Sequence, residues 1–177
     1  PDLYTESAFK GWLATLRQGW IEKIDIHNLP WNQRQKLQQV GGAFSTLLWI
    51  ELSQNPAKSS ADQREFRLQC FGIGDCCLFH IRDNEMLRSF PLTTAAEFDA
   101  DPISICSVDF KKDHQLEFAS LDDNCLEGDL LVLCTDAIGK WAMARIEAGD
   151  PPVWDSYWDM PHDVWLDEII GLRTEKV

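Results

Sequence analysis

The segment GDLLVLCTDAIGKW, residues 128–141, restricts the fold more than any other part of the sequence. Residues 130–135 form an apolar run, which predicts a buried strand. The run ends at a single acid, Asp136. An aspartate in this position either caps the N-terminus of a following helix, as Asp commonly does, or carries chemistry at the end of a sheet.

The composition is that of one globular domain, because a chain of 177 residues with 45% hydrophobic and 25% charged residues is long and apolar enough to bury a core. The net charge of −13 opposes nucleic-acid phosphates and anionic membrane surfaces. The apolar runs are far shorter than the roughly 20 residues of a membrane-spanning helix. The N-terminal residues have no signal-peptide pattern. We therefore expect a soluble, cytoplasmic protein that binds neither nucleic acid nor membranes, in an oligomeric state that the sequence does not indicate.

The cysteines lie mostly in apolar or strand-like segments, and their spacing matches neither a secreted disulfide scaffold nor a pair of C-x-x-C zinc knuckles. We expect all six to be unpaired thiols: Cys70, Cys76, Cys77, Cys106, Cys125 and Cys134. The run CCLFH does not favour zinc, because Cys76 and His80 would lie about 13 Å apart on a strand that rises about 3.3 Å per residue.

Apolar periodicity and turn residues predict helices, then strands, then a helix. Asp83-Asn84 is a competent hairpin turn pair, and the polar stretch before residue 65 suits an exposed connection between antiparallel neighbours. The expected helices are residues 7–25, 31–40 and 161–176, and the expected strands are residues 46–53, 65–73, 76–81, 86–90, 115–120 and 130–135. Residues 94–104 have a disordered composition, and residues 153–165 are expected to pack on the sheets as a flap or helix. This order favours an α+β layered domain over alternating βαβ units.

A second acid, Asp75, follows the Gly-x-Gly bend in FGIGDCCLF, residues 71–79, between two expected strands. By itself it is explained as a turn residue, since Asp is common in tight turns. Its position after a strand nevertheless parallels that of Asp136.

Three segments taken in order resemble successive motifs of the type-2C (PPM) family of metal-dependent serine/threonine protein phosphatases. They are GGAFSTLLWIEL, FRLQCFGIGDCCLFHIRDNEMLRSFPL and LEGDLLVLCTDAIGKW, and the resemblance covers roughly residues 41–141. The matching residues are Phe44-Ser45-Thr46 in the first, Ile73-Gly74-Asp75 and Leu92-Thr93 in the second, and Gly128-Asp129 and Thr135-Asp136 in the third.

The resemblance implies a β-sandwich of two antiparallel sheets flanked by helices, a four-layer αββα arrangement, with Mg or Mn ions at one end. It implies that Asp136 binds a metal of a central pair and that Asp75 serves an additional, weaker metal position. These cations prefer oxygen ligands and keep several waters, so that a few carboxylates suffice. The implied reaction is direct hydrolysis of phosphoserine or phosphothreonine in a protein substrate by a metal-activated water.

The sequence also departs from the family pattern. Cys76-Cys77 replace a Ser-Arg pair, Ala137 replaces a glycine, and residues 1–177 contain neither the family's Asp-Gly-His-Gly segment nor its Asp-Asn motif. We therefore expect a single phosphatase-like domain over residues 1–177, truncated at both ends and inactive by itself.

Two alternatives to the phosphatase remain. The first is a catalytically inactive phosphatase-like module that binds or regulates a partner. The second is a receiver-like α/β domain, which the order of elements disfavours. The phosphatase interpretation predicts that Asp75 and Asp136 converge at one end of the sheet with their carboxylates within about 10 Å, the reach over which acids could share ions spaced about 3.5–4 Å apart.

Overall fold

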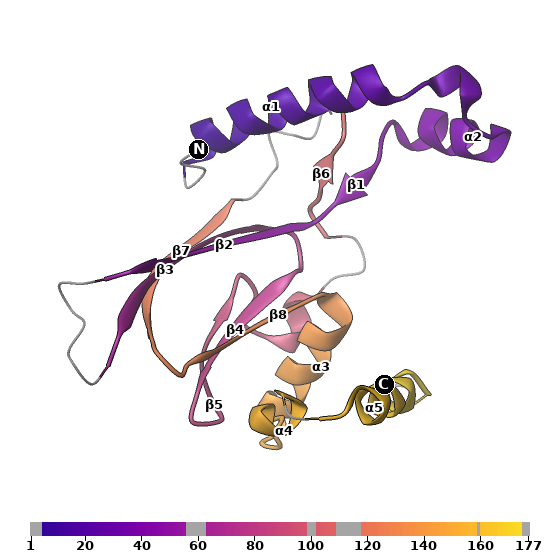
Figure 1. Ribbon diagram of the computed structural model, residues 1–177. Coiled ribbons are helices and arrows are strands. Elements are labelled where there is room, and N and C mark those ends of the chain that lie inside the picture. Colours follow the sequence, from indigo (N-terminus) through magenta and orange to yellow (C-terminus); the bar gives the residue numbers. More distant parts are fainter. Residues whose placement is uncertain (1–4, 56–62, 99–101, 109–117, 159, 175–177) are drawn as a thin grey trace.

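The computed structural model describes residues 5–55, 63–98, 102–108, 118–158 and 160–174. The fold is α+β, with helices before and after a block of antiparallel strands (Figure 1). The helices are α1 (Glu6–Lys23), α2 (Trp31–Val40), α3 (Asp136–Glu147), α4 (Trp154–Trp158) and α5 (His162–Thr174), and the short 3-10 helices are η1 (Ile26–Asn28) and η2 (Ala95–Glu97). The strands are β1 (Phe44–Ser45), β2 (Leu47–Gln54), β3 (Glu65–Ile73), β4 (Cys77–Arg82), β5 (Glu85–Phe90), β6 (Ile105–Cys106), β7 (Ala119–Leu126) and β8 (Leu130–Cys134).

The strands form two three-stranded sheets, in the orders β2-β3-β7 and β5-β4-β8, and a short β1-β6 ribbon. Every strand pair in the described part of the chain is antiparallel. The expected pairing of residues 46–53 with 65–73 is confirmed by the β2–β3 ladder. A receiver-like domain needs a parallel sheet, so that alternative is wrong.

The two three-stranded sheets pack face to face around a shared apolar core. Both sheets contribute to this core because alternate residues of each strand point to the same face. Its buried members are Leu68, Cys70, Leu78, Phe90 and Cys125. The layer between the sheets is thus an inner core of a sandwich.

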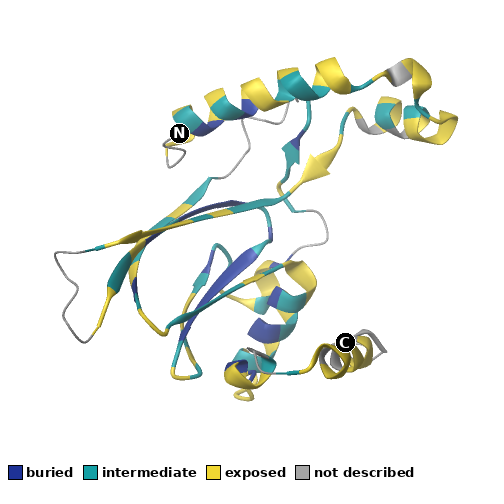
Figure 2. Cartoon of the chain, viewed as in Figure 1, coloured by how far each residue is buried: buried dark blue, intermediate teal, exposed yellow. Residues whose placement is uncertain are grey.

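Helices cover the outer face of each sheet. Phe9 and Leu13 of α1 pack with Phe71 and Ile73 on the outer face of β3. On the opposite side, α3 and α4 pack over β4, where Phe79 contacts Trp154 at a ring-centroid distance of 5.6 Å. Figure 2 shows the buried residues concentrated on the central strands and on the helix faces turned toward them. The order of layers is therefore helix, sheet, sheet, helix.

The β4–β5 hairpin forms as expected. Asp83 and Asn84 have φ angles of 52° and 63°, the left-handed conformation that the favoured two-residue hairpin turn requires. Asn84 also accepts a 2.9 Å hydrogen bond from the backbone N–H of Asp155, which ties the turn to the start of α4. The packing of Trp154 confirms that the start of this aromatic segment lies on the sheet, whereas residues 161–164 are exposed.

The expected helices are confirmed with small changes at their ends. Thr5 accepts a hydrogen bond from Ala8 N at 3.3 Å and so begins α1, which ends at Lys23 because Ile24 is extended. Pro30 and Gly41, the latter with φ of 82°, bracket α2 at the expected positions.

Two expectations are wrong in part. The expectation of disorder in residues 94–104 fails at η2, where Glu97 accepts from the backbone N–H groups of Thr93 and Thr94 at 2.6 and 2.9 Å. These hydrogen bonds, that of Thr93 first, hold the pKa of Glu97 below its ordinary value. Within the same stretch, residues 99–101 lie outside the described residues.

The strand expected at residues 115–120 is β7, which runs from Ala119 to Leu126. Residues 115–117 lie outside the described residues. The sequence prediction stopped early because Asp122 and Asp123 have low strand propensity. Arg67 on β3 pairs with Asp122, and Arg88 on β5 pairs with Asp123 at 2.6 Å, which compensates for that preference.

All six cysteines are free thiols, which confirms that expectation. Among the described residues, no helix combines the length and the apolarity needed to cross a membrane.

Candidate metal-binding site

The turn between β3 and β4 carries Asp75. Gly74 precedes it with φ of 92°, a conformation that glycine adopts without the steric cost that a side chain would add. A Cβ at this position would also collide with the side chain of Thr46 and lie 2.8 Å from the carbonyl oxygen of Ile103. The glycine therefore lets the turn close tightly against the segment that precedes β2.

The β4–β8 ladder brings Asp136 to the same end of the sheet. Cys77, the first residue of β4, pairs with Cys134, the last residue of β8. Asp75 lies two residues before Cys77 and Asp136 lies two residues after Cys134, so both acids leave their strands at the same end of the sheet. Both acids reach the same sheet end, as expected, and a carboxylate separation within about 10 Å stays a prediction.

The two carboxylates differ in exposure and influence each other. The Asp75 side chain is buried, with 8% of the residue exposed, whereas Asp136 is exposed. Burial raises the pKa of Asp75, its own backbone N–H partly opposes the rise, and the negative charge of Asp136 raises it further. The two acids are therefore close enough to repel each other.

Asp136 is not the N-cap of α3, so the capping interpretation is wrong. Thr135 is the N-cap, and its side chain makes no capping hydrogen bond; Asp136 is the first residue of the helix. A carboxylate in the first turn is favoured by the helix dipole, which stabilises its charged form at the N-terminus.

A further contact connects this turn with the segment before β2. The side chains of Thr46 and Cys76 lie 3.1 Å apart, Oγ1 to Sγ, where either atom can donate. The first and second of the three motif segments therefore meet beside Asp75. The hydroxyl of Ser45, the neighbouring motif residue, instead donates to the carbonyl oxygen of Thr46 at 2.9 Å.

Asp75 and Asp136 fit a hydrated divalent cation better than an enclosed metal centre. The described part of the chain holds no group of three or more His, Cys, Asp or Glu side chains arranged to bind a metal ion. Mg²⁺ and similar ions are commonly held by one or two carboxylates and keep several waters. A cation between the two acids would also relieve their repulsion.

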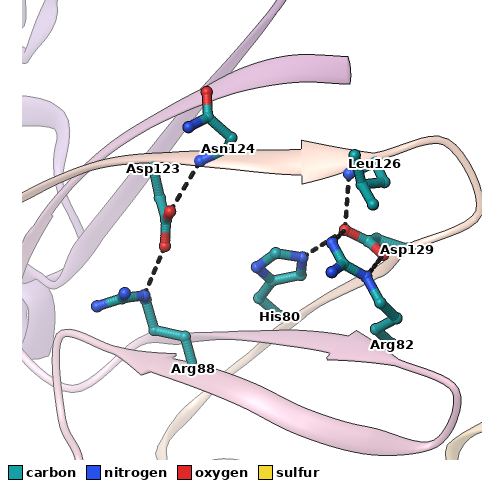
Figure 3. Close-up of polar contacts among 7 residues, drawn as sticks. All are labelled: His80, Arg82, Arg88, Asp123, Asn124, Leu126 and Asp129. Atoms are coloured by element: carbon teal, nitrogen blue, oxygen red, sulfur yellow. Dashed lines mark hydrogen bonds and ion pairs between the residues drawn. The ribbon is translucent and has the colours of Figure 1, made fainter. Parts of the chain in front are cut away.

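Sequence reasoning matched Gly128-Asp129 to a motif but did not identify what Asp129 does. Its carboxylate, 3% exposed, accepts from His80 Nε2 and from Arg82 Nε, each at 2.7 Å, and from Leu126 N at 2.7 Å (Figure 3). Burial would raise the pKa of Asp129, but the hydrogen bonds of Arg82, Leu126 and His80 outweigh it and hold the pKa well below the ordinary range.

This buried ion-pair cluster lies at the far end of β4 from Asp75 and connects β4 with the turn before β8. It belongs to the scaffold rather than to the pair of converging acids. The sequence contains a signal for this cluster. Strand alternation places Leu78, His80 and Arg82 on one face of β4. Because Leu78 on that face is buried, the polar His80 and Arg82 need a buried partner.

Leu92-Thr93, the other matched pair, also serves the scaffold. Leu92 packs against the core beneath α3, and the backbone N–H of Thr93 donates to Glu97, the last residue of η2. No family model, curated protein or solved structure matches the chain.

Proposed function

We propose that the protein is a type-2C-like phosphatase that hydrolyses phosphoserine or phosphothreonine in cytoplasmic proteins with Mg or Mn as cofactor. The observation that carries the proposal is the meeting of Asp75 and Asp136 at one end of the sheets. The helix, sheet, sheet, helix order of layers supports it, because this is the architecture that the motif resemblance implies. The contact of Thr46 with Cys76 adds that all three motif segments reach the same end.

In this proposal Asp75 and Asp136 hold the metal. When bound, the metal lowers the pKa of a coordinated water and neutralises phosphoryl oxygens. Asp136 presents an exposed carboxylate that a hydrated ion can reach, and the buried Asp75 supplies a second negative charge behind it. The pKa of Asp75 is raised partly by Asp136, and a bound cation should lower it.

The test is calorimetric titration of Mn²⁺ into residues 1–177 and into two variants. Asp136→Asn should weaken Mn²⁺ binding by about tenfold or more, which corresponds to about 1.4 kcal/mol. Asp167→Asn removes an exposed acid from α5 and should leave the affinity unchanged. Unchanged Mn²⁺ affinity in Asp136→Asn would end the proposal.

The inactive phosphatase-like module stands as the second candidate, favoured by the absence of a group of three metal-binding side chains among the described residues. Mn²⁺-dependent hydrolysis of a phosphoserine peptide separates the two. It is measured on the protein expressed with any sequence that flanks residues 1–177 in its gene. Turnover supports the enzyme, whereas a folded protein without turnover leaves the binding module. Residues 1–177 alone should show no turnover in either case, because two carboxylates hold a metal pair poorly.

A further inference from the structure

A groove of about 510 Å³ lies between α1 and the β1-β6 ribbon, and neither Asp75 nor Asp136 lines it. Figure 1 shows α1 passing over the ends of β1 and β6. Arg17 of α1 donates from Nε to the carbonyl oxygen of Cys106 at 2.9 Å and so fixes the helix to β6 along one wall. The volume falls within the range of about 300–1,000 Å³ that is typical of small-molecule sites.

The lining of the groove is apolar. Of its lining residues, Leu13 is buried, while Leu16 of α1 and Phe44 of β1 are 49% and 43% exposed. Figure 2 shows the exposed β1 below the helix. Burying such side chains under a ligand contributes about 25 cal/mol per Å² of apolar surface, so the groove favours a hydrocarbon occupant.

The charge of the groove is opposite to that of the chain. The net charge is −13, yet the only charged side chains among the described residues that line the groove are Arg17 and Lys23. Lys23 is exposed in the last turn of α1. The occupant that complements this lining has an apolar body and a negative group.

We infer that the groove binds a small amphipathic anion, a hydrocarbon chain that ends in a carboxylate. The chain lies along Leu13, Leu16 and Phe44, and the carboxylate is directed toward Lys23. Small-molecule sites combine an apolar lining with a few polar groups that fix the ligand's orientation, which is the pattern found here. This inference does not rest on the proposed phosphatase activity, and its test omits divalent cations.

The first experiment titrates residues 1–177 with dodecanoate and with dodecanol, below micelle-forming concentrations, and follows tryptophan fluorescence, since Trp20 lines the groove. Dodecanoate should bind about tenfold more tightly than dodecanol, because the alcohol has the same chain without the charge. Equal affinity for the two, or no saturable binding of dodecanoate, would overturn the inference.

The second experiment blocks the groove. A Cβ at Gly19, which lines the groove, meets no atom within 4 Å, so Gly19→Phe should fold and fill the space. Gly11 is also on α1, has the same open surroundings and lies outside the groove lining, so Gly11→Phe is the matched control. Gly19→Phe should weaken dodecanoate binding at least about tenfold, and Gly11→Phe should leave it unchanged. Equal binding by both variants would contradict the site.

The third experiment tests the charge. Lys23→Gln should weaken dodecanoate binding about threefold to tenfold and leave dodecanol binding unchanged. Lys10→Gln, which removes a lysine paired with Glu6 elsewhere on α1, is its control. Sedimentation of the same samples tests whether a second copy of the chain, rather than the fatty acid, occupies the groove. A dimer that Gly19→Phe dissociates would show that a second copy fills the groove and would overturn the inference.

Discussion

Asp75 and Asp136 lie at the same end of the β5-β4-β8 sheet, because Cys77 at the start of β4 pairs with Cys134 at the end of β8. The arrangement is electrostatically costly without a cation, since the charge of Asp136 adds to the effect of burial on the pKa of Asp75. A helix cap would not require this convergence, whereas a shared cation would.

Asp136→Asn should lower the pKa of Asp75, because it removes one of the two causes that raise it. Burial, the larger cause, remains, so the pKa should stay above the ordinary value for aspartate. The measurement is an NMR titration of the Asp75 carboxyl carbon in metal-free protein. Asp167→Asn is the control, and an Asp75 pKa that shifts equally in both variants would show that Asp136 has no specific effect.

Asp75→Asn should stabilise the metal-free protein at neutral pH. The folded pKa of Asp75 is raised, so the native state holds the proton more tightly and stability falls as pH rises from the unfolded pKa through the folded pKa. Asparagine does not titrate, so the free energy of unfolding of the variant should change less with pH between the unfolded and folded pKa values of Asp75. Urea unfolding at a series of pH values measures this. A variant less stable than the wild type at neutral pH would contradict it.

Asp129→Asn should lower the free energy of unfolding by about 2–3 kcal/mol at neutral pH, because it leaves the Arg82 charge and a backbone donor poorly paired. The effect should shrink in acid. The folded pKa of Asp129 is depressed, so its stabilisation is present above the unfolded value of about 3.9 and is lost as pH falls below it. Urea unfolding of both proteins at neutral pH and near pH 3 measures the difference.

The control for that experiment is Asp122→Asn on β7. Asp122 also pairs with an arginine, Arg67, but both side chains are about half exposed. Exposed pairs contribute little to stability. If the two variants lost equal stability, burial would not be what makes the Asp129 cluster important.

Much of the fold follows from local sequence signals. The β3 boundaries and those of α2 match the expectation residue for residue, because Pro30 and Gly41 punctuate the helix and alternation marks the strand. Residues 121–126 of β7 are not predicted, because Asp122 and Asp123 are stabilised by Arg67 on the adjacent β3 and by Arg88 on the facing sheet, which local strand propensity does not include.

The candidate site is likewise predictable from the sequence only in part. Asp75 and Asp136 were identified from strand-end positions, and the motif order indicated that they converge. The groove below α1 was not predictable, because it depends on how a helix and a distant two-stranded ribbon pack. Strand alternation indicates that His80 and Arg82 need a buried partner, but that the partner is Asp129 depends on how the turn before β8 packs against β4.

The cysteines should react at very different rates with iodoacetamide in the native protein. Only the thiolate reacts, and burial raises the pKa of Cys70 to about 12 and that of Cys77 to about 11. Cys76 is half-buried in the turn between β3 and β4 that carries Asp75, and it should be alkylated first. Peptide mass spectrometry after timed quenching identifies the modified residue. Reducing the protein before alkylation should change neither its mass nor the order in which the cysteines are alkylated. A gain in mass on reduction would contradict six free thiols.

Gly139→Ala should destabilise the protein by about 1–3 kcal/mol, although alanine is the better helix former. A Cβ at Gly139 would lie 2.7 Å from the ring of Phe98, so α3 could not pack as closely against the segment after η2. Gly11→Ala on α1 is the control, since its Cβ meets no atom within 4 Å, and it should stabilise by about 0.5–1 kcal/mol. Thermal unfolding measures both. Adding Phe98→Leu should recover part of the loss at Gly139, because the smaller side chain makes room for the new methyl group. An unchanged loss in the double variant would show that the cost arises elsewhere than at Phe98.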